Sequence, residues 1–225
     1  MASHATVAAV WDEGPLMRGV RLSPTLPPYR AGQALRLLHA SGSALFALAT
    51  ASGDGRSPEL LLRRGGGVAE ALISELQSGA TIDFEGPAGP GFPLETARGK
   101  DVLLVAAGSG ISAIRAVIEE LIDDRDNYGA IALFYGQERA EEFAYAEARA
   151  VWAEARVAVT LCARHPPQAW DGARGFVQDG LLETRLAVDP SRAVAYLCGM
   201  SGMIAGVRQV LGPLGIPLER TFLNY

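Results

Sequence analysis

Gly108-Ser109-Gly110 are the residues of this chain best suited to bind a ligand. They follow the apolar run 102–107, and apolar residues from Ile111 onward recur at helical spacing. A strand, a glycine turn and a helix in this order point free backbone N–H groups and the positive end of a helix dipole at an anion. The turn therefore indicates a site for a nucleotide phosphate, and a tight turn that binds nothing is the alternative.

Composition narrows the classes of protein that fit the chain. Its 225 residues suit one large or two small domains. The net charge of −5 gives no electrostatic support for binding nucleic acid or an anionic membrane. Two cysteines suit a reducing compartment and are too few for an iron–sulfur cluster held by four thiolates. Because the pattern contains neither a signal peptide nor a membrane span, we expect a cytoplasmic protein.

The first half of the chain has the pattern of a small antiparallel β-barrel. Short runs of strand-forming residues are separated by clusters of proline, glycine, serine and aspartate. One helix interrupts them, because apolar residues within 68–76 recur at helical spacing. The predicted strands are 5–10, 17–23, 34–39, 45–50, 59–64 and 81–85.

From Lys100 onward, strands and helices alternate, which predicts a doubly wound domain with a parallel sheet. The expected fold class is α+β with two domains: an N-terminal antiparallel β-barrel over 1–97, then an α/β parallel-sheet nucleotide-binding domain over 98–225. The predicted strands are 102–107, 130–135, 157–162, 194–198 and 221–223, and the predicted helices are 112–122, 141–153, 180–186 and 201–211.

Several short segments match motifs of one known superfamily, in the same order. The longest are Gly86-Pro-Ala-Gly-Pro-Gly-Phe-Pro-Leu94, Ala107-Gly-Ser-Gly-Ile-Ser-Ala-Ile-Arg115 and Tyr196-Leu-Cys-Gly-Met-Ser-Gly-Met203. Over nearly its whole length the chain resembles the ferredoxin–NADP reductase superfamily. It is most similar to the electron-transfer subunits of dihydroorotate dehydrogenases and cytoplasmic hydrogenases. The other matching segments are 29–35, Tyr135-Gly136, 175–179 and 219–225.

The resemblance implies a nicotinamide-nucleotide site in the second half of the chain. Gly108-Ser109-Gly110 would contact the pyrophosphate, and Gly136 would belong to the same cofactor site. Cys198, Gly199 and Met200 would lie near the nicotinamide ring. Cys198 is the candidate catalytic residue, because a thiol packs against the ring without a clash. The alternative is that Cys198 is a small buried residue with a structural role.

The choice between NAD and NADP is left open. Arg139 follows the Tyr135-Gly136 segment and would meet the 2′-phosphate of NADP. Glu138, Glu141 and Glu142 surround it and suit the ribose hydroxyls of NAD better.

The flavin site that the superfamily carries on its barrel is degraded here. The superfamily reads Arg-x-Tyr-Ser or Arg-x-Tyr-Thr where this chain has Ala44-Leu-Phe-Ala47, so only the aromatic ring survives, as Phe46. The second flavin motif is a glycine turn followed by a hydroxyl residue. Here Gly65-Gly66-Gly67 places Ala69, Glu70 or Ala71 near the hydroxyl position, and Glu70 would add a negative charge that opposes a phosphate.

A few residues offer compensation for these losses. Arg63 and Arg64 precede the glycine turn, and one of two consecutive strand residues points to each face. Gly66 and Gly67 still lead into a helix whose N–H groups suit a phosphate. Tyr225 would cover the flavin ring, as a terminal aromatic residue does in some members, or it packs elsewhere.

The leading hypothesis is a flavin-dependent NAD(P)H oxidoreductase or electron-transfer subunit. It would pass electrons from NAD(P)H through FAD or FMN to a partner redox protein. One alternative is a flavin-poor, nucleotide-binding regulatory or assembly subunit. Another is a flavin reductase that uses free flavin as its substrate.

Overall fold

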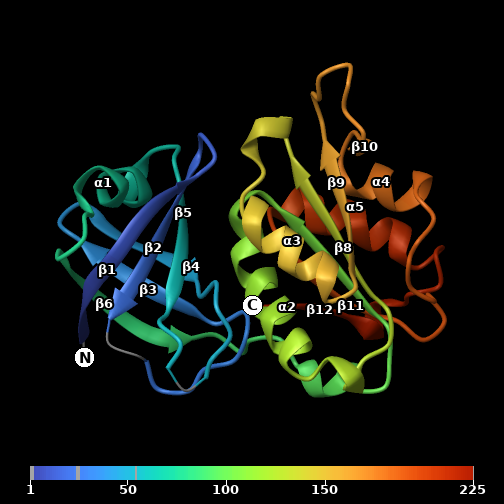
Figure 1. Cartoon of the computed structure of the whole chain (residues 1–225), viewed down its shortest axis with the longest axis horizontal. Coiled ribbons are helices and arrows are strands. Elements are labelled where there is room, and N and C mark those ends of the chain that lie inside the picture. The colour runs from blue at the N-terminus through green and yellow to red at the C-terminus, as the bar shows by residue number, and fades with distance from the viewer. Residues whose placement is uncertain (1–2, 24–25, 54, 225) are drawn as a thin grey trace.

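Two six-stranded sheets lie side by side in the molecule (Figure 1). The computed structural model describes residues 3–23, 26–53 and 55–224. The first sheet is antiparallel and has the strand order β4-β3-β6-β1-β2-β5. Its elements are β1 (Ser3–Glu13), β2 (Met17–Ser23), β3 (Ala34–His39), β4 (Gly42–Ala47), β5 (Glu59–Arg63), helix α1 (Gly67–Glu75) and β6 (Thr81–Ala88).

The first sheet curls into a barrel because its two edge strands approach each other. Leu48, directly after β4, forms an isolated antiparallel bridge with Leu60 of β5. Residues alternate between the interior and the surface, so Val20 and Leu22 of β2 are fully buried whereas Arg21 between them is exposed. The predicted antiparallel barrel is therefore confirmed.

Strand β4 begins and ends three residues earlier than predicted. A two-residue turn pairs His39 directly with Gly42, so the hairpin starts at once. The register of the β3–β4 pair then continues to Ala47, opposite Ala34. Local strand propensity alone does not reveal a turn this tight.

The second sheet is parallel and follows the predicted alternation of strands and helices. A short 3-10 turn, η2 (Gly108–Gly110), connects the first strand to the first long helix. The elements are β7 (Val102–Ala107), α2 (Ile111–Asp123), β8 (Ile131–Gln137), α3 (Ala146–Glu154), β9 (Val157–Ala163), β10 (Ala173–Arg174), α4 (Val177–Glu183), β11 (Val194–Cys198), α5 (Ser201–Leu211) and β12 (Thr221–Leu223).

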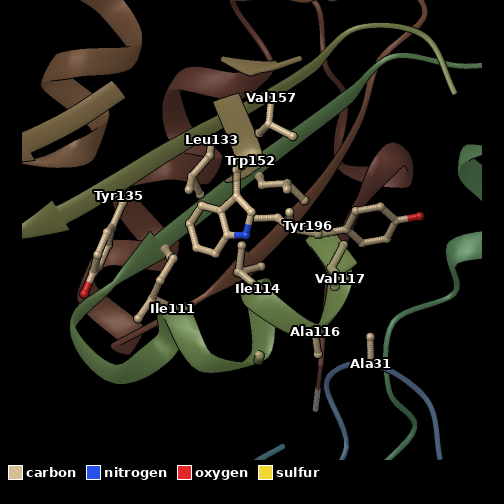
Figure 2. Packing of buried hydrophobic residues seen from close by; sticks show 14 of the residues in the cluster. Ala31, Ile111, Ile114, Ala116, Val117, Leu133, Tyr135, Trp152, Val157 and Tyr196 are labelled. Atoms are coloured by element: carbon tan, nitrogen blue, oxygen red, sulfur yellow. The ribbon is translucent and has the colours of Figure 1, made fainter. Parts of the chain in front are cut away.

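Helices cover both faces of this sheet, as a doubly wound fold requires. On one face, Trp152 of α3 packs among Ile114 of α2 and Leu133 of β8 (Figure 2). On the other face, Leu103 of β7 belongs to a core cluster with Val207 of α5. Both faces are apolar, which explains why the strands are continuous apolar runs in the sequence.

The order of the second sheet is β10-β9-β8-β7-β11-β12. From β7 the chain proceeds outward through β8 and β9, and then returns to the other side of β7 with β11. Such a reversal leaves a crevice at the carboxyl ends of the two central strands, where ligands bind in open α/β sheets. Gly108 follows β7 and Gly199 follows β11, so both candidate motifs lie at this point.

Two helices begin at least three residues away from their predicted first residue. Helix α3 begins at Ala146 and not at 141, because Tyr145 has a left-handed backbone (φ 62°) that cannot continue a helix. Helix α4 begins at Val177 and not at 180. The Asp179 carboxylate accepts a hydrogen bond from the N–H of Phe176 (2.8 Å) and so fixes the earlier start.

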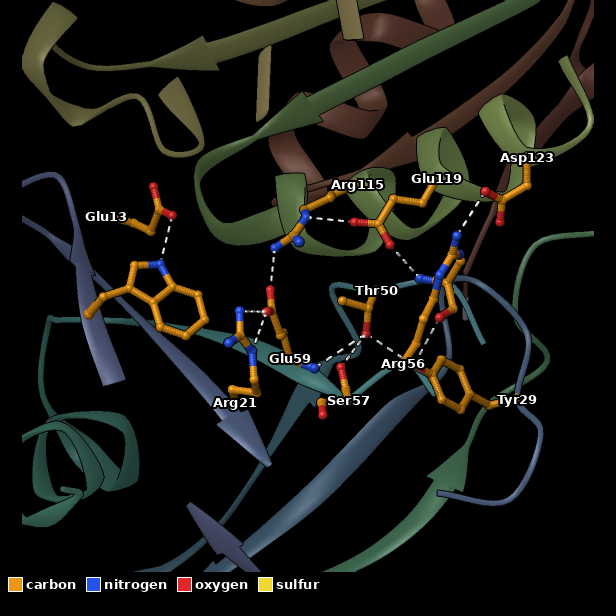
Figure 3. Close-up of polar contacts among 12 residues, drawn as sticks. Glu13, Arg21, Tyr29, Thr50, Arg56, Ser57, Glu59, Arg115, Glu119 and Asp123 are labelled. Atoms are coloured by element: carbon orange, nitrogen blue, oxygen red, sulfur yellow. Dashed lines mark hydrogen bonds and ion pairs between the residues drawn. The ribbon is translucent and has the colours of Figure 1, made fainter. Parts of the chain in front are cut away.

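The two halves are joined by a buried ionic network (Figure 3). Glu59 of β5 has a side chain that is only 7% exposed. Its carboxylate accepts hydrogen bonds from Arg115 of α2 (2.6 Å) and from Arg21 of β2 (2.9 Å). Arg115 also pairs with Glu119 (2.9 Å), and its guanidinium lies 4.8 Å from the ring centre of Tyr145. We call this network between the two halves the seam. Each charge in the seam has a partner, which buried charges require.

Helix α2 makes further contacts with barrel loops. Glu119 accepts a hydrogen bond from the N–H of Ala51 (2.8 Å), and Glu120 accepts one from the N–H of Ala31 (3.1 Å). One helix therefore fixes the position of the barrel relative to the second sheet. Within residues 3–23, 26–53 and 55–224, no helix combines the length and the apolar character needed to cross a membrane.

Replacing Glu59 with alanine should destabilise the protein strongly. The change leaves Arg115 buried without one of its partners, and loss of one member of a buried pair costs about 3 kcal/mol or more. Denaturant unfolding of the variant measures this cost. Glu85→Ala is the matched control, because Glu85 and Arg36 form an exposed pair at 3.8 Å, worth about 1 kcal/mol at most. Equal losses in the two variants would contradict the assigned importance of the seam.

Glu120 predicts a pH dependence of stability. Burial raises the pKa of its carboxyl group above the ordinary value. Folding therefore favours the protonated acid, and this contribution is lost as the pH rises through the folded-state pKa. Glu120→Gln keeps an acceptor for the N–H of Ala31 and removes the charge. The variant should melt at a higher temperature than the wild type near pH 8 and at the same temperature near pH 3.5.

Thermal unfolding at both pH values tests this expectation. Glu154→Gln, at an exposed position of α3, is the control and should leave the melting temperature unchanged at both. A lower melting temperature of Glu120→Gln near pH 8 would show that the carboxylate stabilises the seam instead.

Candidate functional site

A cleft of about 970 Å³ lies between the barrel and the carboxyl ends of the parallel strands. The barrel contributes residues of β4 and β5, and the second sheet contributes the ends of β7, β8, β9 and β11 with the start of α4. The cleft lies at the point where the strand order of the second sheet reverses, between β7 and β11. The residues that carry its chemistry are Phe46, Leu61, Arg63, Gly108, Ser109, Gly110, Glu138, Cys162, Arg164, Phe176, Gln178, Cys198, Gly199 and Met200.

The glycine turn after β7 packs against a second segment of the chain, the end of β11. Gly108 has a left-handed backbone (φ 58°), which a residue with a side chain adopts only with strain. A Cβ atom on Gly110 would overlap the carbonyl oxygen of Cys198 and would lie 2.7 Å from its carbonyl carbon. Glycine at this position therefore lets the turn after β7 pack directly on the end of β11.

The amino end of α2 faces the cleft without a carboxylate of its own. The first turn of α2 contains no acidic residue, and Gly108, Ser109, Gly110 and Ser112 line the cleft. The Ser112 hydroxyl donates a hydrogen bond to the carbonyl of Ser109 (2.9 Å). The partial positive charge at this end is therefore not neutralised by the helix itself.

Arg63 of β5 adds a full positive charge to the same place. A Cβ atom on Gly108 would lie 2.8 Å from its Nη1 atom, so the guanidinium of the barrel reaches the glycine turn of the other half. Among the described residues, no carboxylate lies within ion-pair distance of Arg63, whereas neighbouring Arg64 pairs with Glu70 and Asp12. A guanidinium and a helix amino end are both positive, so an anion placed between them would be stabilised by both.

Cys198 ends β11 at the centre of the cleft. Burial raises the pKa of its thiol to about 12, so the thiol stays protonated at neutral pH. The same holds for Cys162, whose pKa burial also raises to about 12. A protonated thiol is a poor nucleophile, so Cys198 offers a small neutral surface to a ligand. A Cβ atom on Gly199 would overlap the Cε atom of Met203 and would lie 3.3 Å from Ala107, so glycine here allows the chain after β11 to pass close to the end of β7.

The outer rim of the cleft combines an aromatic ring with charged groups. Phe176 is 47% exposed, and the guanidinium of Arg164 lies 4.8 Å from its ring centre. Arg164 also lies 3.4 Å from both carboxylate oxygens of Glu138. Gln178 places a buried Oε1 atom beside the rim, without a hydrogen-bond partner among the described residues.

The barrel wall of the cleft is apolar apart from Arg63. Leu61 is buried, Phe46 lines the cleft and belongs to the barrel core, Ala47 is the last residue of β4, and Leu45 is 55% exposed at the edge. A flat aromatic ligand fits such a wall through dispersion and burial of apolar surface. No hydroxyl group of the barrel lines the cleft within the part of the chain that the structure describes.

The structure brings most of the predicted site residues together. Arg64, Gly66, Gly67 and Arg139 do not line the cleft, and their cofactor roles stay predictions. Tyr225 lies outside the described residues. The predicted residues found in the cleft are Phe46, Arg63, Gly108, Ser109, Gly110, Gly136, Cys198, Gly199 and Met200.

Several cleft residues were missed by the sequence reasoning. Phe176 and Gln178 belong to the segment 175–179, whose match to the superfamily gives a signal for them. Arg164 directly follows β9, so the rule that ligands bind at carboxyl ends of parallel strands gave a usable signal. Glu138, which directly follows β8, was proposed from the sequence for the ribose hydroxyls of NAD, and the structure places it in the cleft. Leu61 is an ordinary apolar strand residue, and its sequence carries no such signal.

Comparison with known proteins agrees with this architecture. Residues 104–209 match the family model described as oxidoreductase NAD-binding domain. The sulfhydrogenase 1 subunit gamma of Pyrococcus furiosus is 30% identical over 170 residues, which are 74% of this chain and 57% of that protein. The electron transfer subunit of dihydroorotate dehydrogenase B (NAD(+)) from Geobacillus sp. is 32% identical over 152 residues, 67% of this chain and 53% of that protein. The chain thus spans little more than half the length of these relatives.

The fold is shared with solved structures over almost the whole chain. The FAD/NAD-binding domain of nitric oxide dioxygenase from Vibrio cholerae superposes with a TM-score of 0.85 at 22% identity, and the match covers 98% of this chain and 96% of that one. The chain therefore has the two-domain fold that is also found in a ferredoxin NADP+ reductase from Neisseria gonorrhoeae. Its second half matches the oxidoreductase NAD-binding domain, and the resemblance stated from the sequence is confirmed by these matches.

The contact between Gly110 and β11 predicts the effect of a single methyl group. Gly110→Ala forces backbone atoms apart and should cost about 2 kcal/mol of unfolding free energy. Gly202→Ala is the matched control, because a Cβ atom there meets nothing within 4 Å and alanine favours a helix. Denaturant unfolding of both variants tests this difference. An unchanged stability of Gly110→Ala would contradict the tight crossing.

Proposed function

We propose that this protein is an NAD(P)H-dependent flavin oxidoreductase that delivers electrons to a partner redox protein. The observation that carries the proposal is the cleft itself, in which Arg63 and the amino end of α2 need an anion and the facing barrel wall suits a flat ring. The relatives' names, an electron transfer subunit and a subunit of a sulfhydrogenase, support the same class of activity.

The nucleotide is proposed to lie along the second half of the cleft. Its pyrophosphate would contact Gly108-Ser109-Gly110 and Arg63, because these groups supply N–H donors and positive charge. The nicotinamide would lie against Cys198 and Gly199, where a neutral thiol adds no charge beside the ring. Its adenosine end would lie near Phe176, which offers an exposed aromatic face.

The residues present fit the ring of a flavin, either FAD or FMN. Phe46, Ala47 and Leu61 provide an apolar wall, and the glycine turn on the opposite side leaves space for a flat group. A bound flavin supplies the chemistry of accepting the hydride of a reduced nicotinamide and releasing electrons to an acceptor. The protein contributes position, exclusion of water and the charge of Arg63.

A protein partner and a reducing compartment complete the proposal. The exposed Leu45 and Met200 lie at the edge of the cleft, where an electron acceptor would approach. Both cysteines are free thiols, which supports the cytoplasm as the compartment.

We propose residues 1–97 as the flavin-type unit and 98–225 as the nucleotide unit.

A nucleotide-binding regulatory subunit is the second candidate function. It is favoured by Ala44 and Ala47, which replace the charged and hydroxyl groups of the superfamily's flavin motif, and by Glu70 at the amino end of α1. Such a protein would bind the nucleotide in the same cleft without transferring its hydride.

Calorimetric titration with NADH and with NADPH tests the nucleotide site. Arg63→Leu should weaken binding of the preferred nucleotide about 10- to 100-fold, because a charge-assisted hydrogen bond to a phosphate is worth about 1.5–3 kcal/mol. Arg64→Leu is the matched control and should leave the affinity unchanged, since Arg64 pairs with Glu70 outside the cleft. Equal effects of the two variants would contradict the role of Arg63.

Anaerobic mixing with flavin and the preferred nucleotide then separates the two candidate functions. Loss of the oxidised flavin absorbance, with turnover that depends on protein, supports the oxidoreductase. Tight nucleotide binding without any flavin reduction would reject it in favour of the regulatory subunit.

A further inference from the structure

The positive end of helix α1 is already occupied by a carboxylate of the chain. Glu70, in the first turn, accepts a hydrogen bond from the N–H of Gly65 (3.1 Å) and another from the guanidinium of Arg64 (3.4 Å). A free helix amino end attracts phosphate, but a carboxylate in this position cancels the attraction and repels a second anion. The exposed turn before α1 therefore does not form a phosphate site, although its glycines leave open space.

The barrel offers a phosphate little else near the cleft. Ala44 packs against the barrel core and Ala47 lines the cleft, and neither side chain donates a hydrogen bond. The cation that the barrel does provide, Arg63, is directed at Gly108 on the opposite wall. The ring of a flavin thus has a surface to bind. Apart from Arg63, which is assigned to the pyrophosphate of the nucleotide, the cleft offers its phosphate end no cation or hydroxyl group among the described residues of the barrel.

We propose that the flavin is an exchangeable substrate recognised by its ring, and that its phosphate or adenylate end adds nothing to binding. This inference rests on the proposed NAD(P)H-dependent reduction and specifies its second substrate. The hydride of the reduced nicotinamide and one proton from water convert the oxidised flavin to the dihydroflavin, leaving the oxidised nicotinamide. The dihydroflavin then leaves and carries both electrons to the acceptor.

Equilibrium quenching of flavin fluorescence tests the inference without any turnover. Riboflavin, FMN and FAD are titrated separately into the complete protein with the oxidised form of the preferred nucleotide in excess, so that the anion site at Arg63 and the glycine turn is filled. The three dissociation constants should agree within about threefold, because no other group that lines the cleft among the described residues of the barrel binds a phosphate. A gel-filtration step after mixing should remove most of the flavin. Affinity for FMN or FAD more than about tenfold above that for riboflavin would overturn the proposal.

A variant of Glu70 tests the cause. Glu70→Gln keeps an acceptor for the N–H of Gly65 and removes the charge that opposes a phosphate. It should strengthen binding of FMN and FAD about two- to fivefold and leave riboflavin unchanged. Glu75→Gln, at the other end of α1, is the matched control and should change none of the three. Equal responses of all three flavins to Glu70→Gln, or no response, would overturn the role given to Glu70.

The outcomes also separate this inference from the proposed function. Reduction of a flavin that stays bound through gel filtration would leave the oxidoreductase intact and overturn only the exchange. Failure of all three flavins to bind would overturn ring recognition, and calorimetry with the nucleotide would then show whether the nucleotide site remains.

Discussion

The carboxylate of Glu59 and the guanidinium of Arg115 meet in a buried seam, and the cleft has its shape because of that contact. Glu59 belongs to the barrel and Arg115 to α2, whose amino end forms the glycine turn. The network that holds the two halves together therefore also sets the distance between the apolar wall and the turn. Because its charges are paired and largely removed from water, salt weakens this arrangement less than it weakens exposed pairs.

Two helices begin after glycine turns, and their electrostatics are opposite. Helix α2 has no acidic residue in its first turn, and its amino end faces Arg63. In α1, by contrast, the carboxylate of Glu70 in the first turn accepts a hydrogen bond from the N–H of Gly65. The positive end of the helix is therefore left without a nearby carboxylate in one half of the molecule and is paired with a carboxylate in the other. Glycines allow a phosphate to approach closely, but the nearest charges decide whether it binds.

The sequence was sufficient to predict the two sheets and most strand bounds, because continuous apolar runs, Gly/Pro clusters and period-2 patterns are local signals. It failed at Tyr145, whose left-handed backbone is held by a hydrogen bond from its N–H to Glu13, a residue of the other half (2.6 Å). It located the glycine turn and Cys198 and left Arg63 and Arg64 as equal candidates. Only the folded structure shows that Arg63, and not Arg64, reaches the glycine turn, because this depends on contacts between residues that are far apart in the sequence.

The crossing of Gly110 over the end of β11 has a thermodynamic consequence. The turn after β7 and the chain after β11 are supported by adjacent, hydrogen-bonded strands and touch through backbone atoms. Neither segment can move without the other. Both segments are therefore already ordered in the folded protein before a ligand binds. A ligand that spans both segments therefore loses little conformational entropy of the protein on binding, and more of its contact energy remains as affinity.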